Sequence, residues 1–365
     1  MTPATRTFPP RIATAAVALL LAACQHDAGP VVSQVGQTAY DGRYIDAHFH
    51  AHPHSGRGGD ASFDMAGAAR AALRLMDANG IAAVVIMPPP FPPGREVTYD
   101  HEELRKAVRA HPHRFAFLGG GGTLNPMIHA TPANAVTPDI LRRFDSEAEA
   151  IMAAGARGFG EMTALHFSFH SAHPFVEGPP DHPLFLRLAD IAARHRVPID
   201  LHMEAATTDV DVSARVRDQS AFNPPRVRAN IPALKRLLSH NPAAAIIWSH
   251  AGWDNTGQRT PALMRELLEA HPNLYMSLKF RRPGAGGGTN PLAGGASLRP
   301  EWLRLMERFP DRFLMATDTH VYVAARRNRF TGRPAQALLR DLPPPLARAV
   351  AYDNARRLFR LGPDS

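Results

Sequence analysis

Eight short apolar runs constrain the fold of this 365-residue chain more than any other feature. Each run is long enough for a buried strand, and amphipathic stretches of helical period separate consecutive runs. Strands that alternate with helices predict a parallel sheet with helices against it. An open doubly wound sheet is disfavoured, because its first turn is glycine-rich and the first turn here carries histidines.

We therefore predict a single-domain α/β fold, a (β/α)8 TIM barrel, over residues 41–361. The predicted strands are 44–47, 81–87, 115–118, 158–162, 198–202, 245–250, 274–278 and 313–317. The predicted helices are 64–78, 101–110, 138–154, 183–195, 231–239, 261–270 and 300–309.

The N-terminus resembles a bacterial lipoprotein signal peptide. Arg6 and Arg11 precede an apolar stretch that is too short to span a membrane as a stable helix. A Leu-Ala-Ala-Cys sequence then ends at Cys24, the only cysteine of the chain. We expect removal of residues 1–23, lipidation of Cys24, and a tether over residues 24–40 that anchors the domain to the cell envelope, facing the periplasm. An ordinary secretory signal with an incidental cysteine is the alternative.

The basic charge of the chain is spread out. The formal net charge is +8, and loss of Arg6 and Arg11 with the signal leaves +6. Nucleic-acid binding is disfavoured, because no run of basic residues is interleaved with aromatic ones. The excess charge suits a small-molecule substrate, including an anionic one.

Metal-binding residue types end five of the predicted strands. His48 and His50 stand at i and i+2 on the first strand, so both imidazoles can reach one ion. In a parallel barrel all the strands deliver their C-terminal ends to one rim. Imidazole and carboxylate ligands suit zinc or a similar divalent ion and predict a metal-dependent hydrolase. The later strands contribute Glu161, His202, His250 and Asp318.

On these residues the chain resembles the amidohydrolase superfamily, in its amidohydrolase-related branch. The supporting segments are 44–50, 158–161, 200–202, 248–252, 316–318 and a closing helix at 352–359. The resemblance implies that His48 and His50 hold one ion and that His202 is a further ligand. It also implies that Asp318 contacts the metal and takes a proton from the water that the metal activates.

Glu161 and His250 leave open whether the chain binds one ion or two. A Gly-Glu pair ending strand four looks like the TatD-type deoxyribonucleases, in which the glutamate bridges two ions. In relatives resembling aminocarboxymuconate-semialdehyde decarboxylase, which use one metal, the strand-six histidine acts on the substrate or polarises water. Glu161 could also orient a histidine without touching metal.

The reaction itself stays open at this point. We expect hydrolysis of an amide, lactone or other ester bond by metal-activated water. Decarboxylation by a metal-dependent carbon–carbon lyase of the same branch is the first alternative. Phosphodiester hydrolysis is less favoured, since no basic, aromatic-rich groove is evident. A binding lipoprotein without catalysis would not need Asp318 beside an open metal position.

Three residues on the loops that follow strands are candidates for substrate binding. His166 follows strand four, and Lys279 and Arg281 follow strand seven. A cation at this rim could hold an anionic group of the substrate.

Other polar residues near these motifs have simpler interpretations. His52 and His54 could line the entrance to the site, but they are expected to be exposed loop histidines. Asp46 is expected to hydrogen-bond within the structure. Glu204 lies two residues beyond His202, where it could contact that ligand.

Overall fold

The computed structural model describes Met1 and residues 42–55, 62–169, 174–279, 287–294, 297–325 and 328–362. Apart from Met1, the predicted signal peptide lies outside these residues, as do Cys24 and the tether. No helix within the described ranges is long and apolar enough to cross a membrane. The residues described from 42 onward belong to one compact unit.

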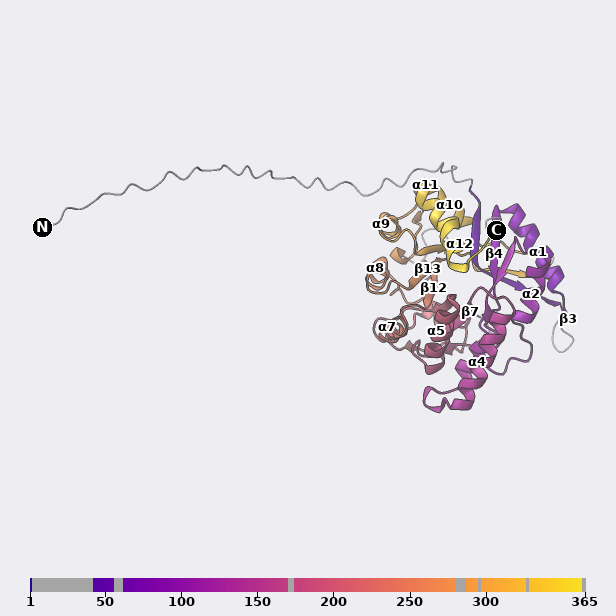
Figure 1. Cartoon of the computed structure of the whole chain (residues 1–365). Helices are drawn as coiled ribbons and strands as arrows, with labels where there is room; N and C mark the ends of the chain where they lie inside the picture. Colours follow the sequence, from indigo (N-terminus) through magenta and orange to yellow (C-terminus); the bar gives the residue numbers. More distant parts are fainter. Residues whose placement is uncertain are drawn as a thin grey trace. The chain divides into compact units, whose positions relative to one another are not determined.

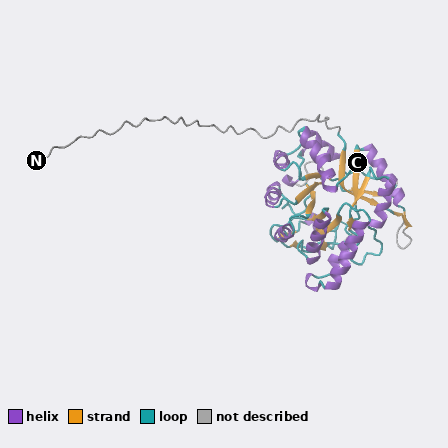
Figure 2. Cartoon of the chain, viewed as in Figure 1, coloured by secondary structure: helices purple, strands orange, loops and turns teal. Residues whose placement is uncertain are grey.

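Parallel strands at the centre of this unit match the eight predicted runs (Figure 2). Strands three and eight are each interrupted, so each carries two labels. The strands are β1 (Tyr44–His52), β4 (Ile81–Ile86), β5 (Phe115–Phe117) with β6 (Gly119–Gly120), β7 (Phe159–His166), β9 (Pro198–Met203), β12 (Ala245–Ala251), β13 (Leu274–Leu278), and β14 (Phe313–Met315) with β15 (Thr319–Tyr322).

The two interrupted strands close the sheet into a barrel. One sheet has the order β15-β1-β4-β5 and the other β14-β13-β12-β9-β7-β6. Between β5 and β6, the backbone N–H of Leu118 donates to the carbonyl oxygen of Ile86 in β4, whereas the N–H of Gly119 donates to that of Gly158, which precedes β7. Between β14 and β15, the backbone N–H of Ala316 donates to the carbonyl oxygen of Leu278 in β13. The backbone N–H of Asp318 donates to the carbonyl oxygen of His48 in β1. Both sheets therefore continue into each other, as the predicted (β/α)8 barrel requires.

Helices surround the strands in chain order (Figure 1). Several begin with proline at the first helical position, where its fixed φ suits the helix and its missing N–H costs nothing. The helices are α1 (Met65–Ala78), α2 (His101–Ala110), α3 (Leu124–Ala130), α4 (Pro138–Ala153), α5 (Pro183–His195), α6 (Ala214–Arg217), α7 (Ile231–His240), α8 (Pro261–Ala270), α9 (Pro300–Arg308), α10 (Arg333–Asp341), α11 (Pro344–Arg348) and α12 (Asn354–Phe359).

The seven predicted helices are confirmed to within two residues, whereas α3, α6, α10 and α11 had not been predicted. Short elements lie between these strands and helices. They are β2 (His54–Ser55) with β3 (Ser62–Phe63), β8 (Val176–Glu177), β10 (Val210–Asp211) with β11 (Arg226–Val227), the 3-10 turns η2 (Ala133–Ala135) and η3 (Gly287–Thr289), and the π-helical turn η5 (Ala349–Asp353).

The barrel interior is apolar at the end where the strands begin. Ile45, Val85, Leu118 and Leu314 pack there in one cluster, together with Phe359 of α12. The polar side chains that can bind a metal lie further along the strands. The closing helix α12 therefore helps to fill the end of the barrel where the strands begin, and the residues that can bind a metal lie toward the opposite end.

Bulges interrupt three of the strands at that opposite end. At each, two consecutive residues face one residue of the neighbouring strand, a pattern that redirects side chains and is common beside active sites. Each bulge contains one predicted site residue. The residue pairs are Ala47 and His48 in β1, Gly160 and Glu161 in β7, and Ser249 and His250 in β12.

Candidate metal centre

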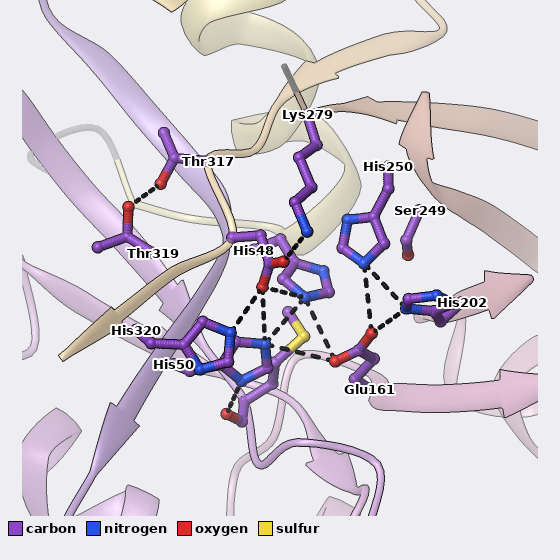
Figure 3. A network of polar contacts seen from close by, with 12 residues as sticks. His48, His50, Glu161, His202, Ser249, His250, Lys279, Thr317, Thr319 and His320 are labelled. Carbon is purple, nitrogen blue, oxygen red and sulfur yellow. Dashed lines mark hydrogen bonds and ion pairs between the residues drawn. The ribbon is translucent and has the colours of Figure 1, made fainter. Parts of the chain in front are cut away.

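The first cluster of site residues joins two histidines and two carboxylates (Figure 3). The Nε2 atoms of His48 and His50 are 3.1 Å apart. Oε2 of Glu161 lies 3.5 Å from the first nitrogen and 3.3 Å from the second. Oδ1 of Asp318 lies 3.7 Å and 3.2 Å from the same two atoms. Ligand bonds of about 2.0–2.1 Å to tetrahedral zinc separate the ligand atoms by about 3.3 Å, so this set suits one small divalent ion.

A second cluster lies at the other oxygen of Glu161. Its Oε1 is 2.7 Å from Nδ1 of His202 and 3.3 Å from Nε2 of His250. Those two nitrogens are 3.0 Å from each other. The two oxygens of Glu161 thus face different histidine pairs, and Figure 3 shows the carboxylate between them.

Both carboxylates are ionised and His250 is neutral, and these protonation states favour metal binding. Burial opposes ionisation of Glu161, but His48 and the other imidazoles hold the pKa of its carboxyl well below the usual range. Burial likewise opposes ionisation of Asp318, where Lys279 and His320 keep the pKa well below normal. Burial and the charge of Lys279 lower the pKa of His250, which leaves a neutral imidazole with a free lone pair.

His48 and His50 behave differently. Although burial disfavours charge, Asp200 and Glu161 raise the pKa of His48 well above its usual value. Asp318 and Glu161 also raise the pKa of His50. Metal ions compete with protons for such nitrogens, so a cation at this cluster would replace the protons that the carboxylates attract.

Further contacts fix the rings of these two histidines. Nδ1 of His50 lies 3.0 Å from the carbonyl oxygen of Met87. Nδ1 of His48 lies 3.2 Å from Oδ1 of Asp200, which also accepts a hydrogen bond from Ser249. Sequence reasoning gave Asp200 no role, although it stands two residues before His202 on one strand. Such partners orient metal-binding imidazoles.

The three predicted substrate-binding residues have different surroundings. Nζ of Lys279 contacts Oδ2 of Asp318 and lies 4.4 Å from the centre of the Trp253 ring. His166 is half-buried, with its ring 4.2 Å from that of His202. Arg281 lies outside the described residues.

His320 is a site residue that sequence reasoning missed. Its Nε2 lies 3.2 Å from Oδ1 of Asp318, and its ring stacks on His50 at 4.4 Å. Its position two residues after Asp318, at the start of the last strand, is the signal that could have identified it.

The prediction that His52 and His54 are exposed is wrong. His52 is buried: its Nε2 lies 2.8 Å from Nδ1 of His320, and Tyr322 stacks on it at 4.3 Å. His54 is half-buried and packs against Phe63 of the β2–β3 hairpin. β1 continues past the motif to His52, so these residues belong to the barrel and its hairpin.

Asp46 and Glu204 stabilise the backbone around the clusters. Asp46 accepts hydrogen bonds from the amide and hydroxyl of Thr317, as expected for a structural residue, and burial raises its pKa to about 6. Glu204 accepts from the amide and side chain of Asn255, so it holds the loop after β12.

Known proteins resemble this chain in sequence pattern and in fold. Residues 45–361 match the family model described as Amidohydrolase. No curated protein sequence matches the chain.

Three solved structures resemble this chain at low sequence identity. A 4-oxalomesaconate hydratase from Rhodopseudomonas palustris has a TM-score of 0.51 at 12% identity, over 87% of this chain and 95% of its own. An uncharacterized TIM-barrel protein from Bordetella bronchiseptica has a TM-score of 0.50 at 15% identity, over 87% and 99%. A dihydroxybenzoic acid decarboxylase from Polaromonas, solved with manganese and an inhibitor, has a TM-score of 0.46 at 15% identity, over 87% and 97%.

Proposed function

The chain belongs to the amidohydrolase family and is an enzyme, and on that premise we propose that it is a hydrolase with two divalent ions. Its substrate would be a small molecule with an amide, lactone or other ester bond. Zinc is the proposed ion, since imidazole and carboxylate ligands suit it.

The position of Glu161 supports this proposal more than any other observation. Its Oε2 faces His48 and His50, while its Oε1 faces His202 and His250. A carboxylate shared in this way is suited to bridge two ions. An orienting glutamate would need only one of these contacts.

The chemistry divides between the ions and the chain. Bound divalent ions would polarise the substrate carbonyl and make water more acidic. Asp318, ionised beside His50, would accept the proton of the attacking water at Oδ2. Lys279 contacts that oxygen, and its charge favours passing the proton on to the leaving group.

Metal analysis of natively purified protein tests the proposal. We expect about two ions per chain, loss of ester or lactone hydrolysis on chelation, and recovery on adding zinc or manganese. One ion per chain would favour the centre with one metal. No ion, and no gain of activity on adding metal, would contradict the catalytic proposal.

Decarboxylation is the second candidate, and Lys279 is the observation that favours it. Its ammonium group, partly buried between Asp318 and Trp253, could instead pair with a carboxylate of the substrate. Assays with aromatic carboxylates should then release CO2, whereas a hydrolase should release none.

We also propose that the enzyme is a lipoprotein of the bacterial envelope, on the strength of the signal pattern that ends at Cys24. Full-length protein expressed in bacteria should fractionate with membranes and incorporate labelled fatty acid. Cys24→Ser should abolish the labelling, because serine offers no thiol to which the lipid can be attached. Equal labelling of both proteins would contradict lipidation at Cys24.

A further inference from the structure

A buried arginine lies behind the end of strand six. Arg259 is 2% exposed and stands between β12 and α8. Its Nη2 donates to the carbonyl oxygen of Trp248 at 2.8 Å, and its Nη1 donates to that of Ser249. These two carbonyls directly precede His250.

The two carbonyls lie where the bulge interrupts β12. Pairing of β12 with β9 extends to Trp248, and pairing with β13 skips from Trp248 to Ala251. Buried carbonyls without ladder partners are costly unless another donor reaches them. His250 also has a φ of 66°, a left-handed conformation that is unusual for a residue other than glycine.

The guanidinium also connects strand six to strand five. It lies 4.0 Å from the centre of the Trp248 ring. The indole of Trp248 in turn donates to the carbonyl oxygen of Met203 at 2.7 Å. Met203 directly follows His202, so a single stack joins the ends of the two strands that carry the second histidine pair.

The charge of Arg259 is compensated inside the fold. Burial lowers its pKa to about 9, and the nearby carboxylates of Glu204, Asp254 and Asp200 counteract that effect. The guanidinium therefore stays protonated at neutral pH. Asp254 also accepts the backbone N–H of Arg259 at 2.9 Å, which fixes the loop that carries it.

We propose that Arg259 is a positioning residue that fixes the β12 bulge and so aims His250 at Glu161 and His202. The inference rests on the proposed centre with two ions, because it assigns Arg259 to one of the two metal pockets. A planar fork is needed to reach two successive carbonyls, and lysine cannot supply it.

Metal titration of the purified full-length protein, with zinc as the probe, tests the inference. Arg259→Ala and Arg259→Lys should weaken binding of one of the two ions by about 10- to 100-fold, as loss of an outer contact to metal ligands does. The other ion should stay bound by the pocket of His48 and His50. Guanidinium at a concentration that does not unfold the protein should restore the affinity of Arg259→Ala, whereas an equal concentration of urea should not.

Phe144→Ala is the matched control for general destabilisation. Phe144 is fully buried on α4, and its loss should lower the melting temperature without selective loss of one ion. Amide hydrogen exchange of the metal-free proteins gives a second measurement. In the two Arg259 variants, protection should fall around residues 248–251 before it falls elsewhere.

The outcomes separate the two proposals. If unmodified protein binds fewer than two ions, the proposed function is wrong and the inference falls with it. If unmodified protein binds two ions and both Arg259 variants bind them with equal affinity, the inference alone is wrong. Unfolding of Arg259→Ala with normal binding by Arg259→Lys would also overturn it.

Discussion

Asp318→Asn is expected to lower turnover by about 10²- to 10⁴-fold, the usual contribution of a general base. The amide keeps the size of the side chain and one oxygen near His48 and His50, so most of the metal should stay bound. The neutral amide, unlike the carboxylate, cannot accept the proton of the attacking water. Steady-state rates and metal content measured on the same preparation test both parts of this expectation.

Asp139→Asn provides the control for this substitution. Asp139 lies in the first turn of α4, with its side chain largely exposed, and pairs with Arg142. The turnover rate of the Asp139→Asn protein should equal that of the unmodified protein. An unchanged turnover rate in Asp318→Asn would show that Asp318 is not the general base. Loss of both the metal and the activity would show that Asp318 acts primarily as a metal ligand.

The barrel and the set of residues around the centre were predictable because both depend on regular patterns. Apolar runs of strand length predict buried strands whatever lies around them. The parallel arrangement then brings the strand ends together, which is why Glu161 and His250, far apart in sequence, lie within 3.3 Å.

The local geometry could not be predicted, because it depends on departures from those patterns. A bulge shifts the alternation of a strand by one residue, and the sequence around His48 or His250 carries no signal for it. The burial of His52 depends on packing against Tyr322 of β15, a neighbouring strand that is far away in the sequence. The contact of Lys279 with Asp318 likewise joins two loops whose separation the sequence does not encode.

Glu161→Gln is expected to reduce the bound metal from two ions per chain to one or none. The amide retains one oxygen for one histidine pair and presents an NH2 group, which cannot bind metal, to the other. Loss of the shared carboxylate also removes the negative charge that offsets two cations. Activity should fall by about 10²- to 10⁴-fold, because metal stabilisation of several kcal/mol converts at about 1.4 kcal/mol per tenfold in rate.

Metal content and turnover should change together in Glu161→Gln, whereas they should separate in Asp318→Asn. Glu102→Gln is the matched control, because Glu102 lies on the first turn of α2, half-exposed and paired with Arg105. The Glu102→Gln protein should bind two ions. Glu161→Gln with two ions and full activity would show that the carboxylate only orients a histidine. With one ion and full activity, the second pocket would be dispensable, and the centre with one metal would account for the chemistry.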